Sequence, residues 1–135
     1  MRKIMIVDDN YLSAEGIEKN IDWEVLNAEI VHICYNGTSA IDAMKKEPVD
    51  LIISDIEMPD LDGISMSRQA LDINPMVKII LISAYDKFEY ARRALLLGAL
   101  DYIEKPLDYA YLIQKVKNAF ALMEREQKNL QLLKQ

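Results

Sequence analysis

The sequence predicts a doubly wound α/β domain, in which helices cover both faces of a parallel five-stranded sheet. Five short apolar or β-branched segments alternate with segments of helical periodicity along the 135 residues, an order typical of βα units. No hairpin signal separates successive strands, so we expect right-handed parallel crossovers. Residues 51–53 are continuously apolar, which indicates a central strand buried on both faces.

Each predicted strand leads into a polar residue. The predicted strands are residues 3–7, 29–34, 51–55, 77–82 and 100–104. The first is β-branched and ends in Asp8 and Asp9. The central strand delivers Asp55, the fourth delivers Ser83, and the fifth is followed by Lys105.

Capping and breaking residues delimit the helices between these strands. Asn10 and Asp86 can each start a helix, and Thr38 or Ser39 can cap the second one. The third helix covers residues 64–73, where Asn74 and Pro75 stop it. Gly98 terminates the fourth helix. One face of the fourth helix is predicted from Phe88, Ala91 and Leu95, and that of the last from Leu112, Val116, Ala119, Phe120 and Met123.

The predicted strand order decides which side chains meet. Among doubly wound five-stranded sheets we expect the flavodoxin-like order 2-1-3-4-5. The first and third strands are then neighbours, so Asp8, Asp9 and Asp55 converge on the carboxyl edge of the sheet. Ser83 and Lys105 join them there from the fourth and fifth strands.

The converging residues predict a magnesium site that handles phosphoryl groups. Three neighbouring carboxylates repel one another, and Mg²⁺ relieves that repulsion while leaving positions for water and phosphate oxygens. A carboxylate so placed can act as a nucleophile and form an aspartyl phosphate. Lys105 can neutralise the phosphoryl charge, and Ser83 can donate a hydrogen bond to it.

The composition argues against several other functions and binding sites. The net charge of −6 and sequence pI near 4.8 argue against nucleic-acid binding by this domain itself. A single cysteine, Cys34, and a single histidine, His32, exclude an internal disulfide and a Cys/His zinc site. No apolar run approaches the roughly 20 residues of a membrane span, and no signal peptide opens the chain. We therefore expect a cytoplasmic protein without membrane contact.

These motifs resemble the receiver domain of bacterial two-component response regulators, over residues 2–123. Asp8 and Asp9 match the family's acidic pair, and Asp55 its phosphoacceptor. Further matches are the switch pair Ser83 and Tyr102, the lysine Lys105, and Met58, Pro59, Gly63 and the Lys105–Pro106 step, where the family often has a cis peptide.

The resemblance implies a mechanism and partners. A sensor histidine kinase or a phosphotransfer protein would supply a phosphohistidine, and Asp55 would take its phosphoryl group. Asp9, Asp55 and the main-chain carbonyl of Glu57 would ligate Mg²⁺, with Asp8 acting mainly through bound water. Ser83 would then move toward the phosphoryl group and Tyr102 would rotate inward, re-shaping the face formed by the fourth helix, fifth strand and fifth helix.

A narrower likeness concerns the output. Asp22, Trp23 and residues 83–91 are similar to receivers that precede an AraC-type helix-turn-helix domain, which implies control of transcription. Residues 124–135 are then a helical linker toward that domain, which this chain lacks; a coiled coil and a frayed end both stay open for this tail. Dimerisation on phosphorylation also stays open. A bulky Tyr85, two residues after Ser83, is predicted to slow dephosphorylation.

Two other functions compete with this reading. A haloacid dehalogenase-like magnesium phosphohydrolase also uses a strand-end aspartate, and Glu57 partly fits its motif, but Pro59 does not. A flavodoxin-like cofactor binder would need a phosphate cradle after the first strand, where this chain has only Asp8, Asp9 and Asn10. We therefore predict a switch that modifies itself and is not a turnover enzyme.

Overall fold

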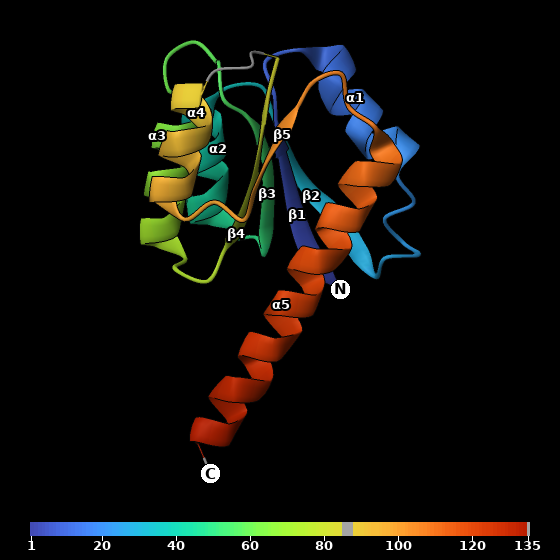
Figure 1. The fold of residues 1–135 in the computed structure, drawn as a ribbon, viewed down its shortest axis with the longest axis vertical. Helices are drawn as coiled ribbons and strands as arrows, with labels where there is room; N and C mark the ends of the chain where they lie inside the picture. The colour runs from blue at the N-terminus through green and yellow to red at the C-terminus, as the bar shows by residue number, and fades with distance from the viewer. Residues whose placement is uncertain (85–87, 135) are drawn as a thin grey trace.

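The computed structural model describes residues 1–84 and 88–134, and its sheet is parallel with the order β2-β1-β3-β4-β5. The predicted strand order is thereby confirmed. Helices α1 and α5 cover one face of the sheet, and α2, α3 and α4 cover the other (Figure 1). The result is a three-layer sandwich with the central strand β3 in its middle.

All ten predicted elements are present, and each strand begins and ends within one residue of the predicted position. The strands are β1 (Arg2–Val7), β2 (Ala28–Cys34), β3 (Leu51–Asp55), β4 (Lys78–Ser83) and β5 (Asp101–Glu104). The helices are α1 (Tyr11–Asn20), α2 (Gly37–Lys46), α3 (Gly63–Ile73), α4 (Phe88–Leu97) and α5 (Tyr109–Leu133). None of the helices in the described part of the chain has the length and hydropathy that a membrane span requires.

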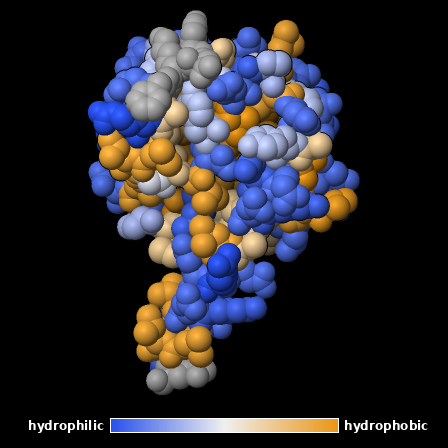
Figure 2. All heavy atoms as spheres, in the orientation of Figure 1, coloured by the Kyte–Doolittle hydropathy of each residue, from blue (hydrophilic) through white to orange (hydrophobic). Residues whose placement is uncertain are grey.

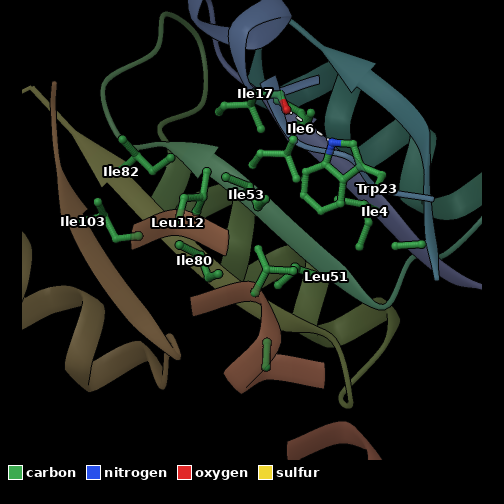
Figure 3. Packing of buried hydrophobic residues seen from close by; sticks show 14 of the residues in the cluster. Ile4, Ile6, Ile17, Trp23, Leu51, Ile53, Ile80, Ile82, Ile103 and Leu112 are labelled. Atoms are coloured by element: carbon green, nitrogen blue, oxygen red, sulfur yellow. Dashed lines mark hydrogen bonds between the residues drawn. The ribbon is translucent and has the colours of Figure 1, made fainter. Parts of the chain in front are cut away.

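Alternate residues of the central strands fill the two cores. Ile4 and Ile6 of β1 pack beneath α1 and α5, whereas Met5 and Val7 face α2, α3 and α4. Every residue of β3 is buried, as the continuous apolar run predicts. Figure 3 shows the first of these cores, where the Trp23 indole donates a hydrogen bond to the Ile17 carbonyl at 3.3 Å. These two cores fix the sheet edge that carries the polar residues.

The cap of α2 differs from the prediction. Asn36, not Thr38 or Ser39, has the extended backbone of an N-cap, and its side chain accepts from the Ser39 N–H at 2.8 Å. The helix therefore begins at Gly37, one turn earlier than a cap at Ser39 would give. A Cβ on Gly37 would lie 2.3 Å from the Leu61 carbonyl oxygen, so a glycine is required where α2 meets the loop after β3.

The inner face of α4 also differs from the prediction. Among the side chains of α4 that the structure describes, Ala94 is the buried one, Tyr90 and Leu97 pack partly against the same core, and Leu95 is 78% exposed. The spacing of residues 90, 94 and 97 is itself helical, so two apolar stripes compete, and packing against the sheet selects this one. Gly98 ends the helix with a left-handed φ of 90°. Asp86, the predicted cap, lies outside the described residues.

The last helix is longer than the core requires. It packs on the sheet through Leu112, Val116 and Ala119, and it then continues beyond the domain to Leu133 (Figure 1). An ion pair of 2.6 Å between Lys78 and Glu126 holds this extension to the start of β4. Farther along, the exposed Leu130, Leu132 and Leu133 form an apolar end of the helix (Figure 2).

Candidate functional site

The carboxyl edge of the sheet positions the predicted site residues. Parallel pairing aligns Val7 with Ser54, and Asp55 with Ile82. Main-chain hydrogen bonds continue one residue past the strands, from the Asp8 N–H to Cys34 and from the Lys105 N–H to the Ser83 carbonyl. The main chain at Asp8 and Lys105 is thus held to the neighbouring strands, which fixes where these two side chains emerge.

Three carboxylates meet at this edge. One carboxylate oxygen each from Asp8, Asp9 and Asp55 lies within 4.8 Å of the others. Asp8 is 2% exposed and Asp55 is 9% exposed, whereas Asp9 faces solvent. The cluster therefore consists of two buried acids and one exposed acid.

Lys105 supplies a positive charge to this acidic cluster. Its ammonium nitrogen lies 3.0 Å from an Asp8 carboxylate oxygen and 3.6 Å from one of Asp55. The lysine follows β5 directly, and its peptide bond to Pro106 is cis. One ammonium group offsets one of the three carboxylates, so the cluster retains net negative charge.

Backbone N–H groups satisfy the remaining oxygens of the buried acids. The Asn10 N–H donates to Asp8 at 2.9 Å, and the Ile56 N–H donates to Asp55 at 3.0 Å. Burial and the neighbouring carboxylate of Asp8 nevertheless raise the pKa of Asp55 to about 6, although Lys105 and the Ile56 N–H act in the opposite direction. Asp55 is thus a carboxylate whose charge is poorly compensated.

The loop after β3 packs tightly against the main chain of Asp55. The Gly63 N–H donates to the Ile56 carbonyl at 2.8 Å, and a Cβ on Gly63 would lie 2.1 Å from the Asp55 carbonyl oxygen. Asp62 caps α3 by accepting from the Ile64 and Ser65 N–H groups. Only a glycine permits this close approach, so Gly63 fixes the backbone that carries Asp55.

A contact across this loop was missed in the sequence. The Tyr90 hydroxyl on α4 donates a hydrogen bond to the carboxylate of Glu57, two residues after Asp55. Both residues are half-buried. A tyrosine within a helical segment carries no signal that it will reach a loop 33 residues earlier, so sequence reasoning had no means of finding it.

The two predicted switch residues lie on neighbouring strands. Ser83 ends β4 and is 1% exposed, and it pairs with Glu104 in the register of β5. Tyr102 pairs with Leu81 and packs partly on the core beneath α2, α3 and α4. Tyr102 also lines a cavity of about 230 Å³ beside Ala94 and Leu95 of α4. Tyr85, which is predicted to slow dephosphorylation, lies outside the described residues.

The fold and the site define a doubly wound α/β domain that gathers three acids and a lysine at the carboxyl edge of its sheet. Residues 4–117 match the family model described as "Response regulator receiver domain". The chain therefore belongs to the response regulator receiver family, as its resemblance implied. The comparisons give no support to the phosphohydrolase alternative.

Solved structures and curated relatives agree with this family. The REC domain of AraT, a response regulator from Geobacillus stearothermophilus, has a TM-score of 0.87 and 34% identity, covering 93% of this chain and 98% of that one. A two-component transcriptional regulator AraC from Clostridium phytofermentans has a TM-score of 0.83 and 29% identity, covering 96% of this chain and 99% of that one.

The similar curated proteins are longer. The transcriptional regulatory protein HptR of Staphylococcus aureus is 32% identical over 114 residues, covering 83% of this chain and 44% of the relative. The transcriptional regulatory protein YesN of Bacillus subtilis, itself described as uncharacterised, is 29% identical over 126 residues, covering 93% of this chain and 34% of the relative. The chain thus spans less than half of these relatives, which are transcriptional regulators.

Proposed function

We propose that Asp55 is the phosphoacceptor of this receiver domain and takes its phosphoryl group from a sensor histidine kinase. The observation that supports this most is the geometry of Asp55 itself. It is a nearly buried carboxylate that shares a 4.8 Å cluster with two other acids and lies 3.6 Å from the Lys105 ammonium. A nucleophile and a cation for the transferred group are thus already side by side.

The transfer needs few groups. A carboxylate oxygen of Asp55 attacks the phosphorus of the phosphohistidine, the P–N bond breaks, and its electron pair stays on the imidazole nitrogen. The product is an acyl phosphate on Asp55. Because the pKa of Asp55 is about 6, the carboxylate is ionised in most molecules at pH 7 and can attack. The Lys105 ammonium then neutralises charge on the phosphoryl oxygens.

The donor set at this edge fits Mg²⁺. Its ligands would be Asp9, Asp55 and the main-chain carbonyl of Glu57, with Asp8 acting mainly through water. These are hard oxygen donors, and the net negative charge that Lys105 leaves on the cluster favours a divalent cation. When bound, Mg²⁺ supplies positive charge that offsets repulsion between the carboxylates and the incoming phosphoryl group.

The switch follows from the neighbours of Asp55. Ser83, at the end of the adjacent strand, moves toward the phosphoryl oxygens, and Tyr102 rotates inward, so the face of α4, β5 and α5 changes shape. The domain acts as a switch and does not turn over a substrate.

A following output domain, of the AraC-type helix-turn-helix class, would then control transcription in the cytoplasm, with residues 124–135 as a helical linker. The transcriptional relatives, less than half of whose length the match covers, support this output.

Acetyl phosphate tests the acceptor directly. We expect the chain to gain one phosphoryl group in the presence of Mg²⁺ and acetyl phosphate, measured by intact mass spectrometry. Asp55→Ala should abolish the gain, whereas Asp42→Ala, at an exposed acid on α2, should not. An unmodified wild type, or an equal gain in Asp55→Ala, would contradict the proposal.

A further inference from the structure

We infer that Tyr11 is a positioning residue for Mg²⁺ binding, because its ring holds the loop that carries Asp9. This inference rests on the proposed function and deepens it by naming a residue that prepares the metal site. Tyr11 opens α1, two residues after Asp9, and its ring stacks on that of Tyr35, with the centroids 4.0 Å apart and the planes inclined by 20°. Tyr11 thus acts through Asp9 and is not itself a proposed ligand.

Asp9 depends on its main chain more than the other two acids of the cluster do. Lys105 pairs with both Asp8 and Asp55. The Asp8 carboxylate also accepts a hydrogen bond from the Asn10 N–H. Within residues 1–84 and 88–134, by contrast, no hydrogen bond or ion pair holds the exposed Asp9 carboxylate. The backbone around Asp9 therefore sets its place beside the other acids.

Two consecutive residues at the end of β2 hold that backbone on both sides of Asp9. Before it, the Asp8 N–H donates to the Cys34 carbonyl at 3.0 Å. After it, the Tyr11 ring stacks on Tyr35, the residue that follows Cys34. Tyr35 packs partly on the core beneath α1 and α5, whereas Tyr11 is 65% exposed. Tyr35 is thus a fixed platform, and the stack ties the loop to the sheet.

The first turn of α1 is held less firmly than the rest of the helix. None of the side chains at positions 11–13, all of which the structure describes, is buried, and the buried face begins at Ala14. The Asn10 side chain accepts from the Leu12 and Ser13 N–H groups, but these hydrogen bonds lie within the turn. The stack is therefore the contact that connects this turn to the end of β2.

Removing the ring should weaken Mg²⁺ binding by about three- to tenfold, the range expected for loss of one aromatic pair. Without the stack, a smaller fraction of molecules has the loop in its binding conformation, and the apparent dissociation constant rises by the inverse of that fraction. Tyr11→Ala removes the ring and keeps a good helix former. Isothermal titration calorimetry with MgCl₂ and the metal-free protein measures the affinity.

Two matched variants accompany this measurement. Tyr11→Phe keeps the ring and should bind Mg²⁺ as the wild type does. Leu12→Ala removes a large side chain from the same turn, at a residue that is 79% exposed, and should also leave the affinity unchanged.

Two further measurements separate positioning from a general effect on folding. In the metal-free protein, hydrogen exchange over residues 8–13 should be faster in Tyr11→Ala than in the wild type, with exchange in the strands unchanged. With acetyl phosphate, Tyr11→Ala should need about three- to tenfold more Mg²⁺ for half of its maximal rate and reach the wild-type rate at saturating Mg²⁺. A lower rate at saturation with an unchanged Mg²⁺ requirement would overturn the inference.

Tyr35 provides the decisive comparison. Tyr35→Leu removes the platform for the stack and keeps an apolar side chain against the core. If the two rings act as a pair, Tyr11→Ala should weaken Mg²⁺ binding in the wild-type background and cause no further loss in the Tyr35→Leu background. Equal losses in both backgrounds would mean that Tyr11 acts without the stack, which overturns the inference.

The outcomes separate the inference from the proposed function. If the wild type binds no Mg²⁺ and gains no phosphoryl group, the proposed function fails. If the wild type binds Mg²⁺ and Tyr11→Ala binds it equally tightly, the inference about Tyr11 is overturned while the proposed function stands. If Leu12→Ala weakens binding as much as Tyr11→Ala does, the effect belongs to the whole turn and the inference is again overturned.

Discussion

Replacing Asp55 by asparagine should stabilise the domain in the absence of divalent cations. Burial and the adjacent acids raise the pKa of Asp55 from its ordinary value of 3.8 to about 6. This difference corresponds to roughly 3 kcal/mol, since a tenfold change in acid dissociation is worth about 1.4 kcal/mol. Asparagine keeps the shape of the side chain and removes the charge that the fold holds unfavourably.

The sign of the pH dependence follows from which state binds the proton more tightly. The folded pKa of Asp55 lies above the unfolded one, so raising the pH from 4 to 7 ionises a group that the folded state disfavours. The free energy of unfolding of the wild type should therefore fall relative to Asp55→Asn. The gap between the two proteins should be smallest near pH 4, widen between pH 4 and pH 6, and level off at roughly 3 kcal/mol above pH 7.

Urea unfolding in a chelating buffer measures this gap. The fluorescence of Trp23 reports the unfolding, because it is the only tryptophan in the sequence and is buried in the folded state. Mg²⁺ should narrow the gap by stabilising the wild type through binding to its folded state. Asp42→Asn, at an exposed acid, should show no comparable gain. Equal stability of wild type and Asp55→Asn at pH 7.5, or a gap that does not shrink toward pH 4, would refute the electrostatic reasoning.

Three further predictions concern the support of the site and of α5. Lys105→Ala should slow phosphorylation of Asp55 by acetyl phosphate at least about tenfold, and an unchanged rate would remove the lysine from the mechanism. Gly63→Ala should lower the free energy of unfolding in urea by about 2 kcal/mol or more, because the new Cβ meets backbone; a neutral change would refute the close approach. Lys78→Met should speed hydrogen exchange at the end of α5, where the ion pair is lost, while Lys128→Met, in an exposed pair, should not; equal exchange in both would contradict the anchoring role.

The sequence was sufficient for the fold because its signals are local. Apolar runs define strands, helical spacing defines helices, and the handedness of parallel crossovers restricts their order. The convergence of Asp8, Asp9 and Asp55 then follows, since a strand end has a fixed place in a parallel sheet. Lys105 is predictable for the same reason, and the structure brings it to 3.0 Å from Asp8.

The features that could not be predicted depend on tertiary contacts. Asn36 caps α2 in place of Thr38 or Ser39, and the loop after β3 packs on Gly37 at the start of that helix. Packing against the sheet decides which face of α4 is buried, and the helical spacing of Leu95 does not reveal that choice. Composition favours helix at the end of α5, but only the fold shows Glu126 paired with Lys78 across 48 residues.

The identity of the modified residue tests the account most directly. Borohydride reduces an aspartyl phosphate to homoserine, and peptide sequencing by mass spectrometry then locates the product. After reaction with acetyl phosphate, we expect homoserine at position 55 alone, and only when Mg²⁺ is present. Homoserine at Asp8, Asp9 or another carboxylate, or an unmodified Asp55 in a phosphorylated chain, would contradict the account.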